Sequence, residues 1–220
     1  MKMSIKTKFL IPMVTLIILG LGIQAVVSFT KSKTGFESLI EGQIKQSEQS
    51  LISTMESWIN DRMLDIDTWS QEKTFQAAMK DSFVGKAARK SASEKLAALK
   101  EKYGYYFSIS LVAPTGDLIA SDNQEHIGKI NLKDRDYFKA AMKGSINMSS
   151  VVKNKANGRP IIVFAAPLKD KEIVEGVIVG VVSLDAFAKK FIDPIKIGQE
   201  GYAYIVDTKG MVLAYPDKSK

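Results

Sequence analysis

The side chains that most often carry covalent or metal chemistry are nearly absent from this sequence of 220 residues. There is no cysteine, which excludes a disulfide scaffold, a thiolate zinc site and a cysteine nucleophile. The single histidine, His126, excludes a multi-histidine metal site and would have to be the only base of a serine hydrolase. We expect no metal site and no catalytic residue, and we interpret His126 as a loop residue, with ligand binding or pH sensing as the alternative.

Motifs for nucleotide and nucleic-acid chemistry are missing as well. The sequence has no GxxxxGK[ST] or GxGxxG loop, no paired-carboxylate motif and no nucleophile elbow. The net charge of +7 reflects a lysine-rich N-terminus and not a basic patch with interleaved aromatic residues, which would indicate nucleic-acid binding. We therefore expect neither an enzyme nor a nucleic-acid-binding protein, and no cofactor.

An uncharged segment, FLIPMVTLIILGLGIQAVVSF, occupies residues 9–29. As a helix it spans roughly 31 Å, enough to cross the hydrocarbon core of a bilayer. Lysines precede it in residues 1–8, which predicts that the N-terminus is cytoplasmic. A cleaved signal peptide is the alternative, although its apolar region would be unusually long. We expect a single-pass membrane anchor, with the rest of the chain outside the cytoplasm.

Apolar residues recur at helical spacing after this segment, in steps of three, four and seven from Phe36 to Trp69. They predict a long stalk helix over 33–80, longer than a small domain is wide. Its lower part, GQIKQSEQS, must stand alone or pair with another chain, which favours a homodimer. The alternative is a helix that kinks around 81–85 and folds back on its own domain.

The pattern beyond the stalk predicts an α+β domain. A second helix is expected over 86–103, with Gly104 as its left-handed stop. Period-two and apolar runs predict strands, and short helices are expected between or after them. Strands joined by tight turns make an antiparallel sheet, and the helices must cover one face of it. The strands are expected at 105–113, 118–120, 159–168 and 173–184, and the short helices at 134–142 and 186–191.

A further hairpin is expected near the C-terminal end, with strands at 201–206 and 211–215. Its sequence, YIVDTKGMVLAYP, repeats the pattern of an earlier one, ISLVAPTGDLIAS. Because a lone hairpin cannot bury a core, it either packs on the first domain or begins a second one.

Five segments together resemble the double Cache (dCache) ectodomains of bacterial methyl-accepting chemotaxis proteins. The segments are APTGDLIASDN, HIGKINLKDRDYFKAAMKG, NGRPIIVFAAPL, VIVGVVSLDAF and IGQEGYAYIVDTKGMVLAYPD. The resemblance implies a PAS-like, membrane-distal Cache sensor domain with an antiparallel sheet over 81–195. It also implies that 196–220 is the start of a truncated membrane-proximal Cache module, so that the chain is the N-terminal fragment of a receptor.

The function that this resemblance implies is ligand sensing by a transmembrane chemoreceptor. The receptor would lie in the bacterial inner membrane, bind a small polar solute in its periplasmic or extracellular domain, and signal to chemotaxis. A sensor region of a membrane histidine kinase or of a cyclic-dinucleotide enzyme is the alternative, as is a truncated receptor remnant that does not signal.

The resemblance also assigns a ligand site. Amino-acid sensors of the family hold a carboxylate with an arginine and adjacent aromatic residues, which match Arg135, Tyr137 and Phe138. An aspartate after the last long strand, here Asp185, holds the ammonium group. Asn154 stands where those sensors have a second ammonium-binding carboxylate, which leaves amino acids, carboxylates and amines open as ligands.

Purely structural interpretations of these residues remain open. Arg135 lies between two aspartates and could form only an ion pair at the start of a helix. Asp185 could cap the helix at 186–191. Tyr137 and Phe138 could be core residues and not walls of a pocket.

Overall fold

The computed structural model describes residues 5–197, 201–206, 210 and 212–214. The chain divides into two compact units, Met1–Thr54 and Met55–Lys220. The first unit contains only one element, the beginning of helix α1 (Ile5–Ser70). Its large apolar side chains are exposed between Phe9 and Phe29. Within the described residues, α1 is the one helix that is long and apolar enough to cross a membrane.

The helix expected over 33–80 is not continuous. Helix α1 ends at Ser70, and α2 (Lys73–Met79) begins after a short turn. No proline or glycine marks this break. The turn is favoured by tertiary contacts, because α2 buries Phe75 completely and Lys95 bonds Glu72 at the turn at 2.6 Å. These contacts outweigh the helical pattern that runs through the break.

Helix α3 (Phe83–Tyr103) begins three residues earlier than expected and ends where the sequence predicts. Ser82 caps its first turn by accepting a hydrogen bond from the Gly85 N–H at 3.1 Å. Gly104 comes after its last turn with φ of 68°, and its N–H donates to the Lys100 carbonyl. The left-handed stop at Gly104 is therefore confirmed.

Six strands form an antiparallel sheet, with β6 at its centre between β1 and β5. The order is β2-β1-β6-β5-β3, and β4 also pairs with β5. The α+β class and the antiparallel sheet are thus confirmed. The strands are β1 (Ser108–Val112), β2 (Leu118–Ser121), β3 (Asn147–Met148), β4 (Val152–Lys153), β5 (Pro160–Asp170) and β6 (Ile173–Ser183).

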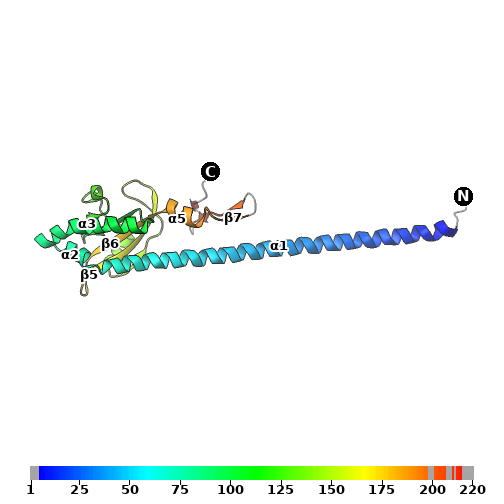
Figure 1. Cartoon of the computed structure of the whole chain (residues 1–220), viewed down its shortest axis with the longest axis horizontal. Coiled ribbons are helices and arrows are strands. Elements are labelled where there is room, and N and C mark those ends of the chain that lie inside the picture. Colours follow the sequence, from blue (N-terminus) through cyan, green and yellow to red (C-terminus); the bar gives the residue numbers. More distant parts are fainter. Residues whose placement is uncertain (1–4, 198–200, 207–209, 211, 215–220) are drawn as a thin grey trace. The chain divides into compact units, whose positions relative to one another are not determined.

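The two faces of the sheet are covered by different elements. Helices α2 and α3 pack on one face of the sheet (Figure 1). The C-terminal part of α1 joins them, and its Trp58 contacts Phe164 of β5. Helix α4 (Asp136–Met142) packs on the other face, where Phe138 and Ala141 share a core with Val163 and Val179. The expectation that helices cover one face is therefore wrong, since α4 is too apolar on one side to remain in solvent.

The remaining elements are short. A 3-10 turn, η1 (Gln124–His126), lies between β2 and α4, and α5 (Leu184–Phe191) comes directly after β6. Two small antiparallel pairs come next, β7 (Lys196–Ile197) with β8 (Gly201–Tyr202) and β9 (Ile205–Val206) with β10 (Val212–Ala214). The single strand expected at 201–206 is therefore two short strands, β8 and β9, which belong to different antiparallel pairs. The turn between the two strands of the expected hairpin was predicted at 207–210, and its residues 207–209 lie outside the described residues. The second Cache module over 196–220 remains a prediction.

Two glycines on β6 allow the helices to approach the sheet closely. A Cβ atom on Gly180 would lie 2.7 Å from the Tyr106 ring and 2.8 Å from Cδ1 of Ile66 on α1. A Cβ atom on Gly176 would lie 2.7 Å from the Val112 carbonyl oxygen and would overlap the sulfur of Met79 on α2. Both positions therefore require the absence of a side chain.

Gly176→Ala is expected to lower the free energy of unfolding by about 1–3 kcal/mol, because the new methyl group meets a backbone oxygen that cannot rotate away. Thermal unfolding of the full chain in detergent, monitored by circular dichroism, measures the change. Gly42→Ala is the control, since no atom lies within 4 Å of the position of its Cβ. Equal melting temperatures for the two variants would contradict the prediction.

Candidate functional site

A pocket lies on the sheet face that carries α4, and its floor comes from three adjacent strands. Because side chains alternate along a strand, every second residue of β1, β5 and β6 points to this face. Ser108 of β1 and Val163 of β5 are both paired with Val181 of β6, so the three side chains lie in one row across the sheet. The floor residues are Ser108, Ser110, Ile161, Val163, Val179 and Val181.

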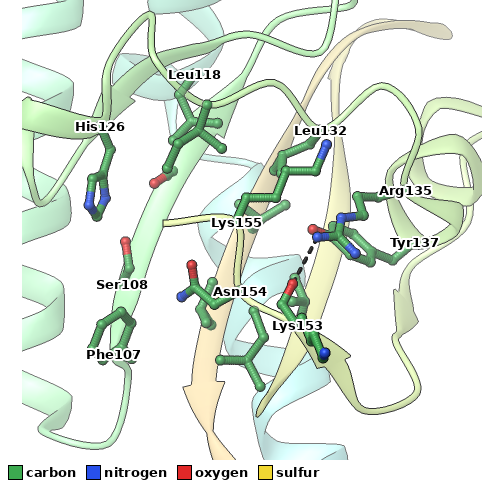
Figure 2. Close-up of a pocket in the computed structure, with 16 residues that line it drawn as sticks. Phe107, Ser108, Leu118, His126, Leu132, Arg135, Tyr137, Lys153, Asn154 and Lys155 are labelled. Atoms are coloured by element: carbon green, nitrogen blue, oxygen red, sulfur yellow. Dashed lines mark hydrogen bonds between the residues drawn. The ribbon is translucent and has the colours of Figure 1, made fainter. Parts of the chain in front are cut away.

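Loops and short elements form the walls. Figure 2 shows Arg135 and Tyr137 on one side of the pocket and His126 and Phe107 on the opposite side. The enclosed cavity volume is about 50 Å³, and the empty space rises to about 490 Å³ when the open solvent at the mouth is included. The enclosed part has room for a small solute and not for a macromolecule. The other wall residues are Leu118, Ile130, Leu132, Lys153, Asn154 and Lys155.

Arg135 is held at the pocket by the backbone of a neighbouring strand. Its Nη2 donates a hydrogen bond to the Lys153 carbonyl oxygen at 2.8 Å, as the dashed line in Figure 2 marks. Its Nε is buried and has no hydrogen-bond partner among the described residues. The two flanking aspartates pair elsewhere, Asp134 with Lys155 and Asp136 with Lys139. Arg135 therefore does more than form an ion pair at the start of a helix, and one buried N–H group can still donate.

The two predicted aromatic residues have different positions. Tyr137 lines the pocket, is 6% exposed, and has its pKa raised to about 12 by burial, so its hydroxyl is protonated at neutral pH. Phe138 is 3% exposed, belongs to the core between α4 and the sheet, and does not line the pocket. Tyr137 belongs to the same core and also reaches the pocket, so only Phe138 departs from its prediction as a pocket wall.

Asn154 and Asp185 also differ in their relation to the pocket. Asn154 lines it, and its Oδ1 accepts a hydrogen bond from the Ala156 N–H at 2.7 Å. Asp185 is exposed in the first turn of α5 and lies outside the pocket lining, so the ammonium-binding role predicted for it is not supported. The alternative interpretation as a cap is wrong too, since Ser183 accepts from the Ala186 N–H at 3.1 Å.

Two lysines of the pocket were not predicted from the sequence. Lys153 and Lys155 flank Asn154, and both line the pocket. The Lys155 ammonium donates to the Asn131 carbonyl at 2.7 Å and to the Asp134 carboxylate, and the latter bond lowers the pKa of Asp134. Val179 and Val181 also line the pocket and were not predicted to do so. Their period-two spacing in β6, which pairs with β1, could have placed them on the pocket face. No comparable signal in the sequence marks the two lysines.

A buried polar cluster joins α1 to the segment that leads into the pocket. Oδ2 of Asp65 accepts hydrogen bonds from Arg62 Nε at 2.8 Å, from the Tyr105 hydroxyl at 2.9 Å and from the Tyr106 hydroxyl at 3.3 Å. Burial raises the pKa of both tyrosines above the ordinary value of 10.0, so both remain donors. The next residue, Phe107, lines the pocket.

Comparison with known proteins gives one family and several similar structures. A double-Cache family model, described as a Cache domain, matches residues 32–220. The methyl-accepting chemotaxis protein McpA of Pseudomonas putida is 20% identical over 225 residues, which cover 100% of this chain and 33% of that protein. The chain thus spans about a third of the length of the curated relatives that it matches.

Two sensor domains of known structure have a similar fold. The ligand-binding domain of the Pseudomonas fluorescens chemoreceptor CtaA, solved with L-serine, has a TM-score of 0.59 and 21% identity, over 83% of this chain and 74% of that one. The sensor domain of the V. cholerae histidine kinase DctB has a TM-score of 0.62 and 19% identity, over 71% of this chain and 60% of that one. At these identities the likeness concerns the fold.

Proposed function

Since this chain belongs to the Cache domain family, we propose that it is the ligand-sensing region of a transmembrane chemoreceptor. In this role it binds a small solute and does not catalyse a reaction. The observation that carries the proposal is the pocket around Arg135, whose guanidinium is anchored by a backbone carbonyl and retains a buried donor without a partner among the described residues. The name of the P. putida relative, a methyl-accepting chemotaxis protein, supports chemotaxis as the output.

The proposed setting is the inner membrane of a bacterium. Residues 9–29 would cross the bilayer, residues 1–8 would be cytoplasmic, and the sensor domain over 81–195 would lie outside the cytoplasm. The apolar residues of α1 that remain exposed beyond the membrane segment support a homodimer, because a second copy could cover them. These residues are Phe36, Leu39, Ile40, Ile44, Ile52 and Leu64.

The second candidate is the sensor region of a histidine kinase. The similarity in fold to the DctB sensor domain favours it, with a TM-score of 0.62. The two candidates share the pocket and differ in the output that ligand binding controls. Deletion of the gene would abolish taxis toward the ligand for a chemoreceptor, whereas it would leave taxis intact and change gene expression for a kinase.

The proposal is tested by ligand-induced stabilisation of the full chain in detergent. A panel of small organic acids, amino acids and amines is screened, and a ligand at a hundred times its dissociation constant should add about 2.7 kcal/mol of stability. The expected rise in melting temperature is roughly 5–10 °C for a domain of this size. Arg135→Ala should abolish the rise, because the anchored guanidinium is lost.

Arg159→Ala is the matched control, since Arg159 is exposed and lies outside the pocket lining. It should respond to the ligand as the unchanged chain does. A panel that stabilises neither the unchanged chain nor the control, or that stabilises Arg135→Ala equally, would refute a ligand site at Arg135.

A further inference from the structure

The charged residues that line the pocket all carry the same sign. Among the described residues, they are Arg135, Lys153 and Lys155, and no aspartate or glutamate lines the pocket with them. The strand β6, after which an ammonium-binding aspartate was expected, contributes only Val179 and Val181. The pocket therefore presents donors and positive charge, but no carboxylate that could receive a positively charged group.

The carboxylates that bond to lining residues are already neutralised. In the described part of the chain there are two, Asp122 and Asp134. Asp122 has a side chain that is 2% exposed, and it accepts from Ser108 Oγ at 2.6 Å and from Lys100 Nζ at 2.7 Å. Asp134 pairs with Lys155. Each of these acids thus has its own lysine, which offsets its negative charge.

Much of the remaining lining is aliphatic. Seven lining residues have aliphatic side chains, which suit the non-acidic part of a ligand. An ammonium group placed among them would lose its hydration without gaining a counter-charge, which is costly. The seven are Leu118, Ile130, Leu132, Ile161, Val163, Val179 and Val181.

We propose that this pocket selects small aliphatic carboxylates that carry no amino group, and that it discriminates against amino acids of the same carbon skeleton. The inference rests on the proposed sensory function and narrows its ligand. The carboxylate would accept from the buried Nε of Arg135, and the hydrocarbon chain would lie on the valines of β5 and β6. The selectivity comes from the charge of the lining, because the described lining residues include three cations and no carboxylate to pair with the ammonium group.

The test compares molecules that share one skeleton. Isothermal titration of the full chain in detergent uses 4-methylpentanoate, L-leucine and 4-methylpentanamide. We expect 4-methylpentanoate to bind at least about tenfold more tightly than L-leucine, since the ammonium group is left unpaired. The amide, which has no negative charge, should bind no better than L-leucine. Arg135→Ala should lose 4-methylpentanoate binding, and Arg159→Ala should retain it.

Asn154→Asp provides a reciprocal test. The substitution is nearly isosteric, retains the oxygen that accepts from the Ala156 N–H, and adds a carboxylate to the lining. It should strengthen L-leucine binding relative to 4-methylpentanoate by about tenfold. An unchanged ratio in this variant would count against the argument from charge.

The outcomes separate the two proposals. If L-leucine binds the unchanged chain as tightly as 4-methylpentanoate, and through Arg135, the sensory function stands and the ligand class is overturned. If neither these probes nor the wider panel binds, or if Arg135→Ala binds them equally, the ligand class and the sensory site at Arg135 both fail.

Discussion

Replacing Trp58 with alanine is expected to lower the free energy of unfolding by about 3–5 kcal/mol. The indole is 8% exposed and forms edge-to-face contacts with four rings, at centroid distances between 5.5 and 6.1 Å. Those rings come from the segment before β1, from β5 and from α5, so one side chain connects α1 to three parts of the domain. The rings are Tyr105, Phe164, Phe187 and Phe191.

The measurement is thermal unfolding of the full chain, in which the melting temperature should fall by roughly 6–20 °C. Leu64→Ala on the same helix is the control, since Leu64 is 64% exposed and should change stability little. Trp58→Phe should lose less than Trp58→Ala, because a smaller ring retains part of the contacts. If Trp58→Ala and Leu64→Ala had the same melting temperature, the tryptophan would not be a core residue.

The second large effect is expected for Asp65→Asn, with a loss of about 3 kcal/mol. Arg62 is 8% exposed and lies over the Tyr105 ring at 4.0 Å, and Asp65 provides its counter-charge. Without that charge, a buried guanidinium remains unpaired, which costs more than the pair contributes when it is intact. The melting temperature should fall by roughly 6–12 °C.

Asp61→Asn removes the same charge one turn earlier on α1, at an exposed position, and should have little effect. Adding Arg62→Met to Asp65→Asn should restore part of the stability, since the uncompensated charge is then gone while the asparagine oxygen still accepts from the tyrosines. A double variant less stable than Asp65→Asn alone would argue against an unpaired charge as the cause.

Local sequence signals predicted the elements that depend on local physics. Gly104 ends α3 because a left-handed residue suits glycine, and this needs no knowledge of the rest of the chain. The apolar run of β6 predicted a strand buried on both faces, and Val177, Ile178 and Val179 are indeed buried. The long apolar start of α1 and the antiparallel sheet were predicted from the same kind of pattern.

Tertiary contacts decided the features that the sequence did not predict. The break after Ser70 depends on the burial of Phe75 and on a lysine that comes more than twenty residues later. In the site, Arg135, Tyr137 and Asn154 line one pocket and their ligand-binding roles stay predictions, whereas Asp185 lies on α5 outside the pocket. The neutralisation of Asp122 and Asp134 depends on Lys100 and Lys155, a pairing that spacing along the chain does not reveal.

The glycine at position 180 has a mechanical consequence. Val179 and Val181 form part of the pocket floor, whereas Gly180 between them faces Ile66 of α1 with no side chain in the way. At this point the floor and the helix are separated only by the thickness of one polypeptide backbone. Close-packed protein interiors have low compressibility and transmit strain, and β6 is held in the middle of a hydrogen-bonded sheet. Displacement of this strand by a bound molecule would therefore be passed directly to α1.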